Sequence, residues 1–143
     1  MSHRITLEQA NAVVHGALAK GAELGLKPLT VVVLDAGGHP IALQRQDGAS
    51  TLRPGIACGK AGGALALGVS SRTIGDMAAE RPTFVGALGT IAPHGIIPAA
   101  GGVIVVSADG FPIGAIGITG DTSDNDEVCA KAGIAAAGLT AQH

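Results

Sequence analysis

Hydrophobic and polar positions along this chain alternate between a helical period and a strand period. The first helical period begins at the capping box Thr6-Leu7-Glu8-Gln9 and ends where Gly25 and Pro28 interrupt it. Its apolar positions are spaced three and four residues apart: Leu7, Ala10, Val13, Val14, Ala17, Leu18 and Ala22. This spacing predicts an amphipathic helix that starts after Thr6.

Two later segments follow the strand period and have the same order of residue types. Val31–Ile41 reads VVVLDAGGHPI and Val103–Ile113 reads VIVVSADGFPI, and six of their eleven positions coincide. In each segment a β-branched run meets a Gly-rich turn, and the chain then continues through a proline, which sheets tolerate at the start of a strand or on an edge. Each segment therefore predicts a β-hairpin, the first over about residues 29–46. The likeness reflects either one turn chemistry used twice or an internal duplication.

Helical patterns fill most of the remaining chain. Asp47-Gly48-Ala49-Ser50 leads into a second helix with Pro54 in its first turn, and Ser70–Glu80 predicts a short third one. A loop-rich stretch with three prolines follows over residues 82–100. Ser123–Asp126 caps the last helix, whose expected buried face is Val128, Ala132, Ala135 and Leu139.

The return strand of the second hairpin is apolar on both of its faces. Ile113, Ala115 and Gly117 alternate with Gly114, Ile116 and Ile118. A strand of this kind belongs to a sheet that is covered on both sides. The order helix, hairpin, helix, helix, hairpin, helix predicts an α+β fold with an antiparallel sheet between helical layers, in one domain over residues 1–143. We expect the glycines of this strand to let the first or the last helix press onto it.

The second predicted helix is unusually rich in glycine. Gly55, Gly59 and Gly63 recur every four residues and therefore share one face. Each glycine costs about 1 kcal/mol relative to alanine inside a helix, so a compensating contact is expected. Close helix packing, a contact between subunits, or a ligand lying on the backbone would each supply it. From this face we predict a homo-oligomer.

Composition narrows the possible functions. The chain has 143 residues, a net charge of −2, two Phe and neither Trp nor Tyr. Nucleic-acid binding is excluded on this basis, because it needs a basic surface and usually aromatic rings that stack on bases. Cys58 and Cys129 are far apart, which predicts free thiols and a reducing compartment. No apolar run approaches the roughly 20 residues that span a bilayer, so we expect a cytoplasmic protein without membrane contact.

Three side chains stand out as candidates for chemistry. His39 lies at the first hairpin turn and His94 in the proline-rich stretch, where each is either a surface residue or a ligand. Lys60 lies within an Ala/Gly/Leu helix and either reaches solvent or presents its ammonium to an anionic group. The chain has no GxSxG, HExxH or CxxC motif and no paired histidines at metal-binding spacing.

Short motifs along the chain share their order and spacing with a known family. They are Asp35-Ala-Gly-Gly-His39, Arg45, Asp47-Gly48-Ala49, Ala57-x-x-Lys60-Ala61, Gly101-Gly102, Gly114-Ala-Ile-Gly117 and Asp126. The set covers nearly the whole chain and resembles the GlcG/HbpS family, which includes the C-terminal domain of PduO-type proteins. The resemblance implies a profilin-like α-β-α sandwich around an antiparallel sheet of about five strands, and a homo-oligomer. It also implies haem binding, as in some members, with roles in haem or iron handling. Many members are encoded in small-molecule catabolic operons.

The chain departs from the family pattern at three places. Gly62-Gly63 replaces a bulkier residue and a threonine, Val103-Ile104 replaces Leu-Pro, and Thr119 replaces a serine. The first departure opens space on the helix that carries Lys60.

Three hypotheses for function follow. In the first, the protein binds haem between subunits or against the glycine-rich helix, with His39 or His94 as iron ligand and with Lys60 and Arg45 on the propionates. In the second, it is a lyase, isomerase or hydrolase for a small anionic metabolite. Arg45 and Lys60 would hold the substrate's carboxylate, and His39, Asp47 or His94 would act as general acid or base. The third is a structural or partner-binding subunit without chemistry of its own.

Overall fold

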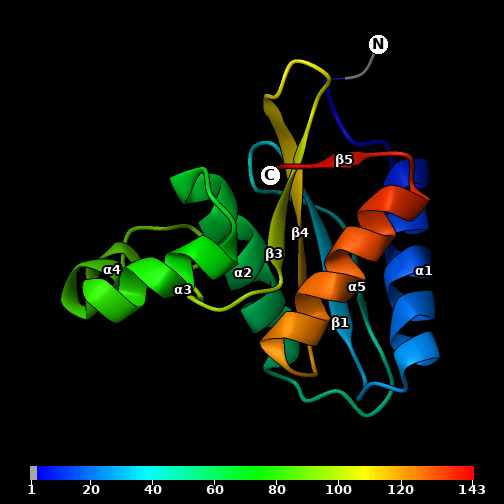
Figure 1. Ribbon diagram of the computed structural model, residues 1–143, viewed down its shortest axis with the longest axis horizontal. Helices are drawn as coiled ribbons and strands as arrows, with labels where there is room; N and C mark the ends of the chain where they lie inside the picture. The colour runs from blue at the N-terminus through cyan, green and yellow to red at the C-terminus, as the bar shows by residue number, and fades with distance from the viewer. Residues whose placement is uncertain (1–2) are drawn as a thin grey trace.

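The computed structural model describes residues 3–143, which form an α-β-α sandwich (Figure 1). In chain order the elements are α1 (Leu7–Leu24), β1 (Thr30–Asp35), β2 (Pro40–Arg45), α2 (Arg53–Leu67), α3 (Ser71–Glu80), α4 (Pro82–Leu88), β3 (Gly102–Val106), β4 (Pro112–Thr119), α5 (Ser123–Ala136) and β5 (Thr140–Ala141). Helices α1 and α5 cover one face of the sheet and α2 covers the other. The expected α+β fold class is confirmed.

The sheet is antiparallel throughout and has the strand order β2-β1-β4-β3-β5. Strand β1, which lies between β2 and β4, is buried on both faces. Val31 and Val33 join the core on the side of α1 and α5, whereas Val32 and Leu34 pack with alanines of α2. Strand β4, for which the doubly apolar pattern predicts this arrangement, likewise has Ile116 and Ile118 in the first core and Ala115 in the second, so the expectation of a sheet covered on both sides is confirmed.

Both predicted hairpins are present and use the same turn. The N–H of Gly38 donates to the carbonyl of Asp35 (3.0 Å), and that of Gly110 donates to Ser107 (2.9 Å). The two glycines have φ values of 86° and 84°, a left-handed conformation that side chains disfavour. The strand register shifts near the proline that follows each turn. The two hairpins therefore share one turn chemistry, as their sequence likeness predicts.

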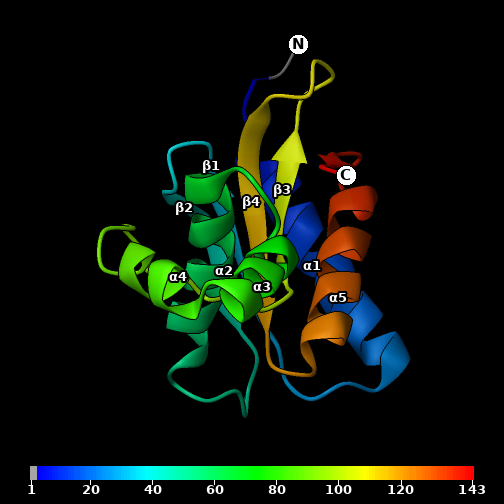
Figure 2. The same cartoon turned by 60° about the vertical axis from the view of Figure 1, so that its left-hand side comes forward.

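The segment predicted to be loop-rich contains the helix α4. Pro82 occupies its first turn, where the missing N–H costs nothing, and the Arg81 guanidinium lies 4.1 Å from the centre of the Phe84 ring. Figures 1 and 2 show α3 and α4 beside α2, on the outer side of the sandwich. The prolines therefore delimit a short helix here instead of preventing one.

The buried face of α5 differs from the expected one. The buried residues are Asp126, Cys129, Ala130, Gly133 and Ile134. Val128 is instead 43% exposed, so the face expected to be buried points largely to solvent. Gly133 explains the rotation, because a Cβ at this position would collide with the backbone of Val13 in α1. The helix turns its smallest side chain toward α1, which lets the two backbones approach closely.

Gly117 of β4 accommodates α2. A Cβ at Gly117 would overlap the carbonyl oxygen of Ala57, which lies on α2. The expectation that α1 or α5 presses onto these glycines is therefore wrong at Gly117. The close approach brings the lysine of α2 against the sheet.

Candidate functional site

The five residues predicted to form a site lie at three separate places. His39 lies on the turn between β1 and β2, and His94 is hydrogen-bonded to Gly38 of the same turn. Arg45 and Asp47 lie at the opposite end of β2 and line a different cleft. Lys60 is buried between α2 and the sheet. The sequence pattern therefore selects residues from three environments. Of the five residues, only the two histidines lie at the same turn.

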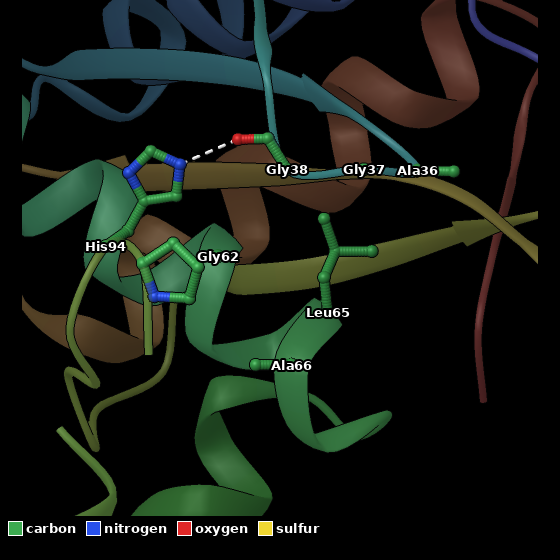
Figure 3. A pocket seen from close by; sticks show the side chains of 8 residues that line it. Ala36, Gly37, Gly38, Gly62, Leu65, Ala66 and His94 are labelled. Carbon is green, nitrogen blue, oxygen red and sulfur yellow. Dashed lines mark hydrogen bonds between the residues drawn. The ribbon is translucent and has the colours of Figure 1, made fainter. Parts of the chain in front are cut away.

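His94 is held against the β1–β2 turn by a short hydrogen bond. Its Nε2 lies 2.6 Å from the carbonyl oxygen of Gly38 (Figure 3). A carbonyl oxygen only accepts, so Nε2 carries the proton and donates, and Nδ1 keeps its lone pair. The ring also covers Gly62, where a Cβ would lie 2.7 Å from the His94 Cδ2. The space left by the small residue at position 62 is thus filled by an imidazole.

His39 lies on the same turn, with its ring over Gly37. Its Nδ1 is 3.3 Å from Oδ1 of Asp35, and the side chain is 79% exposed. Backbone N–H groups of His39 and Gly37 donate to the same carboxylate oxygen, each at 2.9 Å. These bonds, that of His39 first, hold the pKa of Asp35 below its usual value. A carboxylate beside Nδ1 favours the proton there and leaves the Nε2 lone pair outward, which is the usual arrangement of a metal-ligating histidine.

A cavity of about 190 Å³ lies between this turn and α2. Its lining is Ala36, Gly37, Gly38, Gly62, Leu65, Ala66, Pro93 and His94. The imidazole of His94 is the one titratable side chain in this lining, and three glycines leave the backbone accessible to a flat ligand. A second cavity of about 170 Å³ shares Ala66 and Pro93 with the first and continues the apolar surface past Leu88, Ile91 and Ile96.

Lys60 forms a buried ion pair and does not reach this cavity. Its Nζ donates to Oδ2 of Asp126 (3.1 Å) and to the carbonyl of Ile118 (3.0 Å). The two side chains are 3% and 1% exposed. Burial lowers the pKa of Lys60 and raises that of Asp126, and their mutual attraction opposes both shifts. The interpretation of Lys60 as an anchor for a ligand carboxylate or a propionate therefore disagrees with its position.

Asp126 is the partner that sequence reasoning missed. It belongs to the acidic start of α5, which reads as ordinary helix capping. Its other oxygen accepts the backbone N–H of Asp121 (3.0 Å), so the carboxylate joins α5 to the end of β4. The sequence contained one signal for such a partner, a lysine in a helix of small and apolar residues, because a buried ammonium needs a carboxylate somewhere in the chain.

Arg45 and Asp47 line an open cleft of about 490 Å³ at the far end of β2. Leu26, Pro28 and Gln46 complete its lining. The expectation that Arg45 and Lys60 converge on one pocket is wrong, because the lysine points inward to Asp126. Arg45 is close to neither His39 nor His94, since the turn and the arginine occupy opposite ends of the same strand.

Over residues 3–143 no helix is long and apolar enough to cross a membrane. The same residues contain no cluster of three or more His, Cys, Asp or Glu side chains that could hold a metal ion.

Comparison with known proteins gives one consistent picture. The model of a family described as haem degrading protein HbpS-like matches residues 5–135. An uncharacterized 15.0 kDa protein in the dhaT-dhaS intergenic region of Citrobacter freundii is 29% identical over 91% of this chain and 89% of its own length.

Solved structures are similar over almost the whole chain. A double mutant of HbpS from Streptomyces reticuli is 31% identical with a TM-score of 0.80, covering 94% of this chain and 88% of its own. Klebsiella pneumoniae protein ORFY is 26% identical with a TM-score of 0.83, covering 94% and 90%. The structure of a PduOC:heme complex has a TM-score of 0.85 at 21% identity, covers 98% and 99%, and shows the shared fold.

Proposed function

The chain belongs to the HbpS-like family, and from this membership and the site geometry we propose that it binds haem in the cavity between the β1–β2 turn and α2. The observation that carries the proposal is an apolar, glycine-lined cavity that has the imidazole of His94 in its lining and lies beside the turn that carries His39. The family is described by its action on haem, and a structural neighbour of the same fold is a haem complex.

His39 is the proposed iron ligand. Its exposed ring lies on the turn that borders the cavity, outside the lining itself, and the Asp35 carboxylate 3.3 Å from Nδ1 would orient the ring and make a ligating Nε2 more basic. His94 has a different part. By donating to Gly38 it fixes the turn that presents His39, so we assign it a positioning role. Bound haem would supply a redox-active iron whose potential depends on this imidazole and on the surrounding apolar groups.

The shape of the site fits one face of a flat macrocycle. A cavity of about 190 Å³ is smaller than the roughly 300 to 1,000 Å³ of pockets that enclose a drug-sized ligand. The adjoining cavity past Leu88 and Ile91 extends the apolar floor but leaves the other face uncovered. We therefore propose that a second copy of the chain covers that face in a homo-oligomer. The propionates would point to solvent, since neither Arg45 nor Lys60 reaches this cavity.

The enzymatic alternative has no comparable support. It required Arg45 and Lys60 to hold one carboxylate beside a histidine, and these groups lie in three different environments. We retain the cytoplasm as the proposed location, because Cys58 and Cys129 are both free thiols, as expected in a reducing compartment.

Titration with haemin tests the proposal directly. Absorbance is the appropriate signal, because the chain has no tryptophan whose fluorescence could be quenched. We expect a shifted Soret band that saturates at one haem per chain, or per pair of chains, at micromolar haemin. A spectrum identical to free haemin at all ratios would refute haem binding.

A further inference from the structure

Three polar side chains form a row across the sheet at the end opposite the haem cavity. Arg45, Thr30 and Thr119 occupy directly opposed positions in β2, β1 and β4. Opposed residues of antiparallel strands point to the same face. Thr30 alternates with Val32 in β1, and Val32 packs against α2, so the row lies on the face that α2 covers.

The first turn of α2 lies at this row. Arg53 is the first residue of the helix, and its guanidinium donates to the hydroxyl of Thr119 (2.7 Å). No side chain caps this end of the helix, where Leu52 occupies the cap position. The N–H groups of Arg53 and Ile56 are bonded to the carbonyls of Ser50 and Leu52, so it is the helix dipole that gives this end a partial positive charge and favours anions.

The row carries uncompensated positive charge. Over the described residues neither Arg45 nor Arg53 has a carboxylate within ion-pair distance, although Asp47 is only two positions beyond Arg45. The nearby carboxylate of Asp126 is already committed to Lys60. Burial is the main cause that lowers the pKa of Lys60, and the charge of Arg53 acts in the same direction.

A buried hydroxyl without a partner lies in the middle of the row. Thr30 is fully buried, and its Oγ1 is the one buried side-chain polar atom of residues 3–143 that has no hydrogen-bond partner. An orphaned hydroxyl destabilises a folded protein, and it persists where another group supplies the missing bond. Thr30 stands between Arg45 on one neighbouring strand and Thr119, the partner of Arg53, on the other.

We propose that this row is a binding site for an oxyanion, the carboxylate or phosphate group of a small metabolite. Arg45 and Arg53 supply the charge, Thr30 Oγ1 donates a further hydrogen bond, and the first turn of α2 adds its dipole. The site is separate from the haem cavity, because β2 runs between them from the turn at Pro40 to Arg45. It does not depend on the proposed haem function.

Calorimetric titration with inorganic phosphate and with succinate, at an ionic strength held constant with KCl, tests the site. We expect saturable binding of at least one probe, and the tighter of the two identifies the group that the site prefers. Arg45→Gln and Arg53→Gln should each weaken binding at least tenfold. Lys131→Gln removes an equal charge from an exposed position of α5 and should change affinity less than twofold.

Thr30→Val separates a binding role from a structural one. It removes the orphaned hydroxyl with little change of shape, so the probe-free variant should melt at or above the wild-type temperature, while probe affinity falls severalfold. Absence of saturable binding by either probe would overturn the proposal. So would an equal loss of affinity in Lys131→Gln and Arg45→Gln, since that result reflects net charge alone. Haemin uptake by Arg45→Gln should equal that of wild type, which keeps the two sites distinguishable.

Discussion

At the scale of single residues, Lys60 and Asp126 form an ion pair that is almost fully excluded from water. Removing one partner of such a pair leaves an uncompensated buried charge, which costs about 3 to 5 kcal/mol. We therefore expect Lys60→Met to lower the free energy of unfolding by about that amount in urea denaturation. Lys131→Met breaks an exposed pair with Glu127 and should cost about 0 to 1 kcal/mol. Equal effects of the two variants would mean that Lys60 does not pair in solution.

A second prediction at this scale concerns acid stability. The side-chain bond from Asn125, followed by the N–H groups of Thr122 and Lys27, lowers the pKa of Asp121 from 3.8 to about 2. The unfolded chain then binds this proton more readily than the folded protein does. The stability from Asp121 is therefore complete above about pH 4 and is lost as the pH falls from 3.8 toward 2.

Urea unfolding between pH 5 and pH 2 measures this dependence. Asp121→Asn should show a shallower loss of stability on the acid side than wild type. Asp126 contributes the opposite dependence of stability on pH, because its pKa is raised mainly by burial. The comparison of variants is therefore needed to isolate the contribution of Asp121. An unchanged acid limb in Asp121→Asn would contradict the assignment.

At the scale of elements, the glycines of α2 have individual neighbours within the same chain. A Cβ at Gly59 would lie 2.5 Å from Cγ1 of Ile97, one at Gly62 would meet His94, and one at Gly55 would meet nothing within 4 Å. The loop that carries His94 therefore supplies the compensating contact expected for this face at Gly59. Gly59 and Gly62 consequently give no support for a contact between subunits.

Alanine substitutions in α2 test this account. Gly55→Ala should raise the free energy of unfolding by up to about 1 kcal/mol, the usual gain inside a helix. Gly62→Ala should lower it by about 1 to 3 kcal/mol, because the methyl group displaces the His94 ring from Gly38. In a His94→Ala background, Gly62→Ala should lose most of this cost. An equal cost in both backgrounds would show that His94 does not pack on Gly62.

Local sequence patterns predicted which helices and strands form better than they predicted which face of a helix is buried. The capping box at Thr6 and the two hairpins are set by chemistry within a few residues, and both are present. The face of α5 depends on how Gly133 meets α1 across more than 100 residues of chain, and the apolar spacing of α5 alone misplaces it. Helix α4 was missed because Pro82 reads as a break although it starts the helix.

At the scale of the whole molecule, the sequence likewise predicted residues of the site better than their arrangement in space. The family pattern identified His39, Arg45, Lys60 and Asp126, but not which of them meet. Antiparallel pairing puts Arg45 at one end of β2 and the His39 turn at the other, and this follows only from the fold. The contact between His94 and Gly38 could not be predicted from the sequence, because it depends on how the chain after α4 runs back across α2.

Oligomerisation is the remaining prediction at this scale. Its basis is the open face of the haem cavity and the exposed apolar side chains beside it, with Ile91 78% exposed. Light scattering should give a mass well above the 13.9 kDa of one chain at micromolar concentration. A mass of one chain at every concentration, with and without haemin, would contradict the proposed cover of the cavity by a second copy.

The most direct test of the haem site is a haemin titration, followed by absorbance, of three single-alanine variants. His39→Ala should weaken haem binding at least tenfold and change the position of the Soret band, because it removes the proposed iron ligand. His94→Ala should weaken binding less and keep the band position. His15→Ala, an exposed histidine on α1, should behave as wild type. Unchanged spectra and affinity in His39→Ala, or loss of the band in His15→Ala instead, would contradict the site described here.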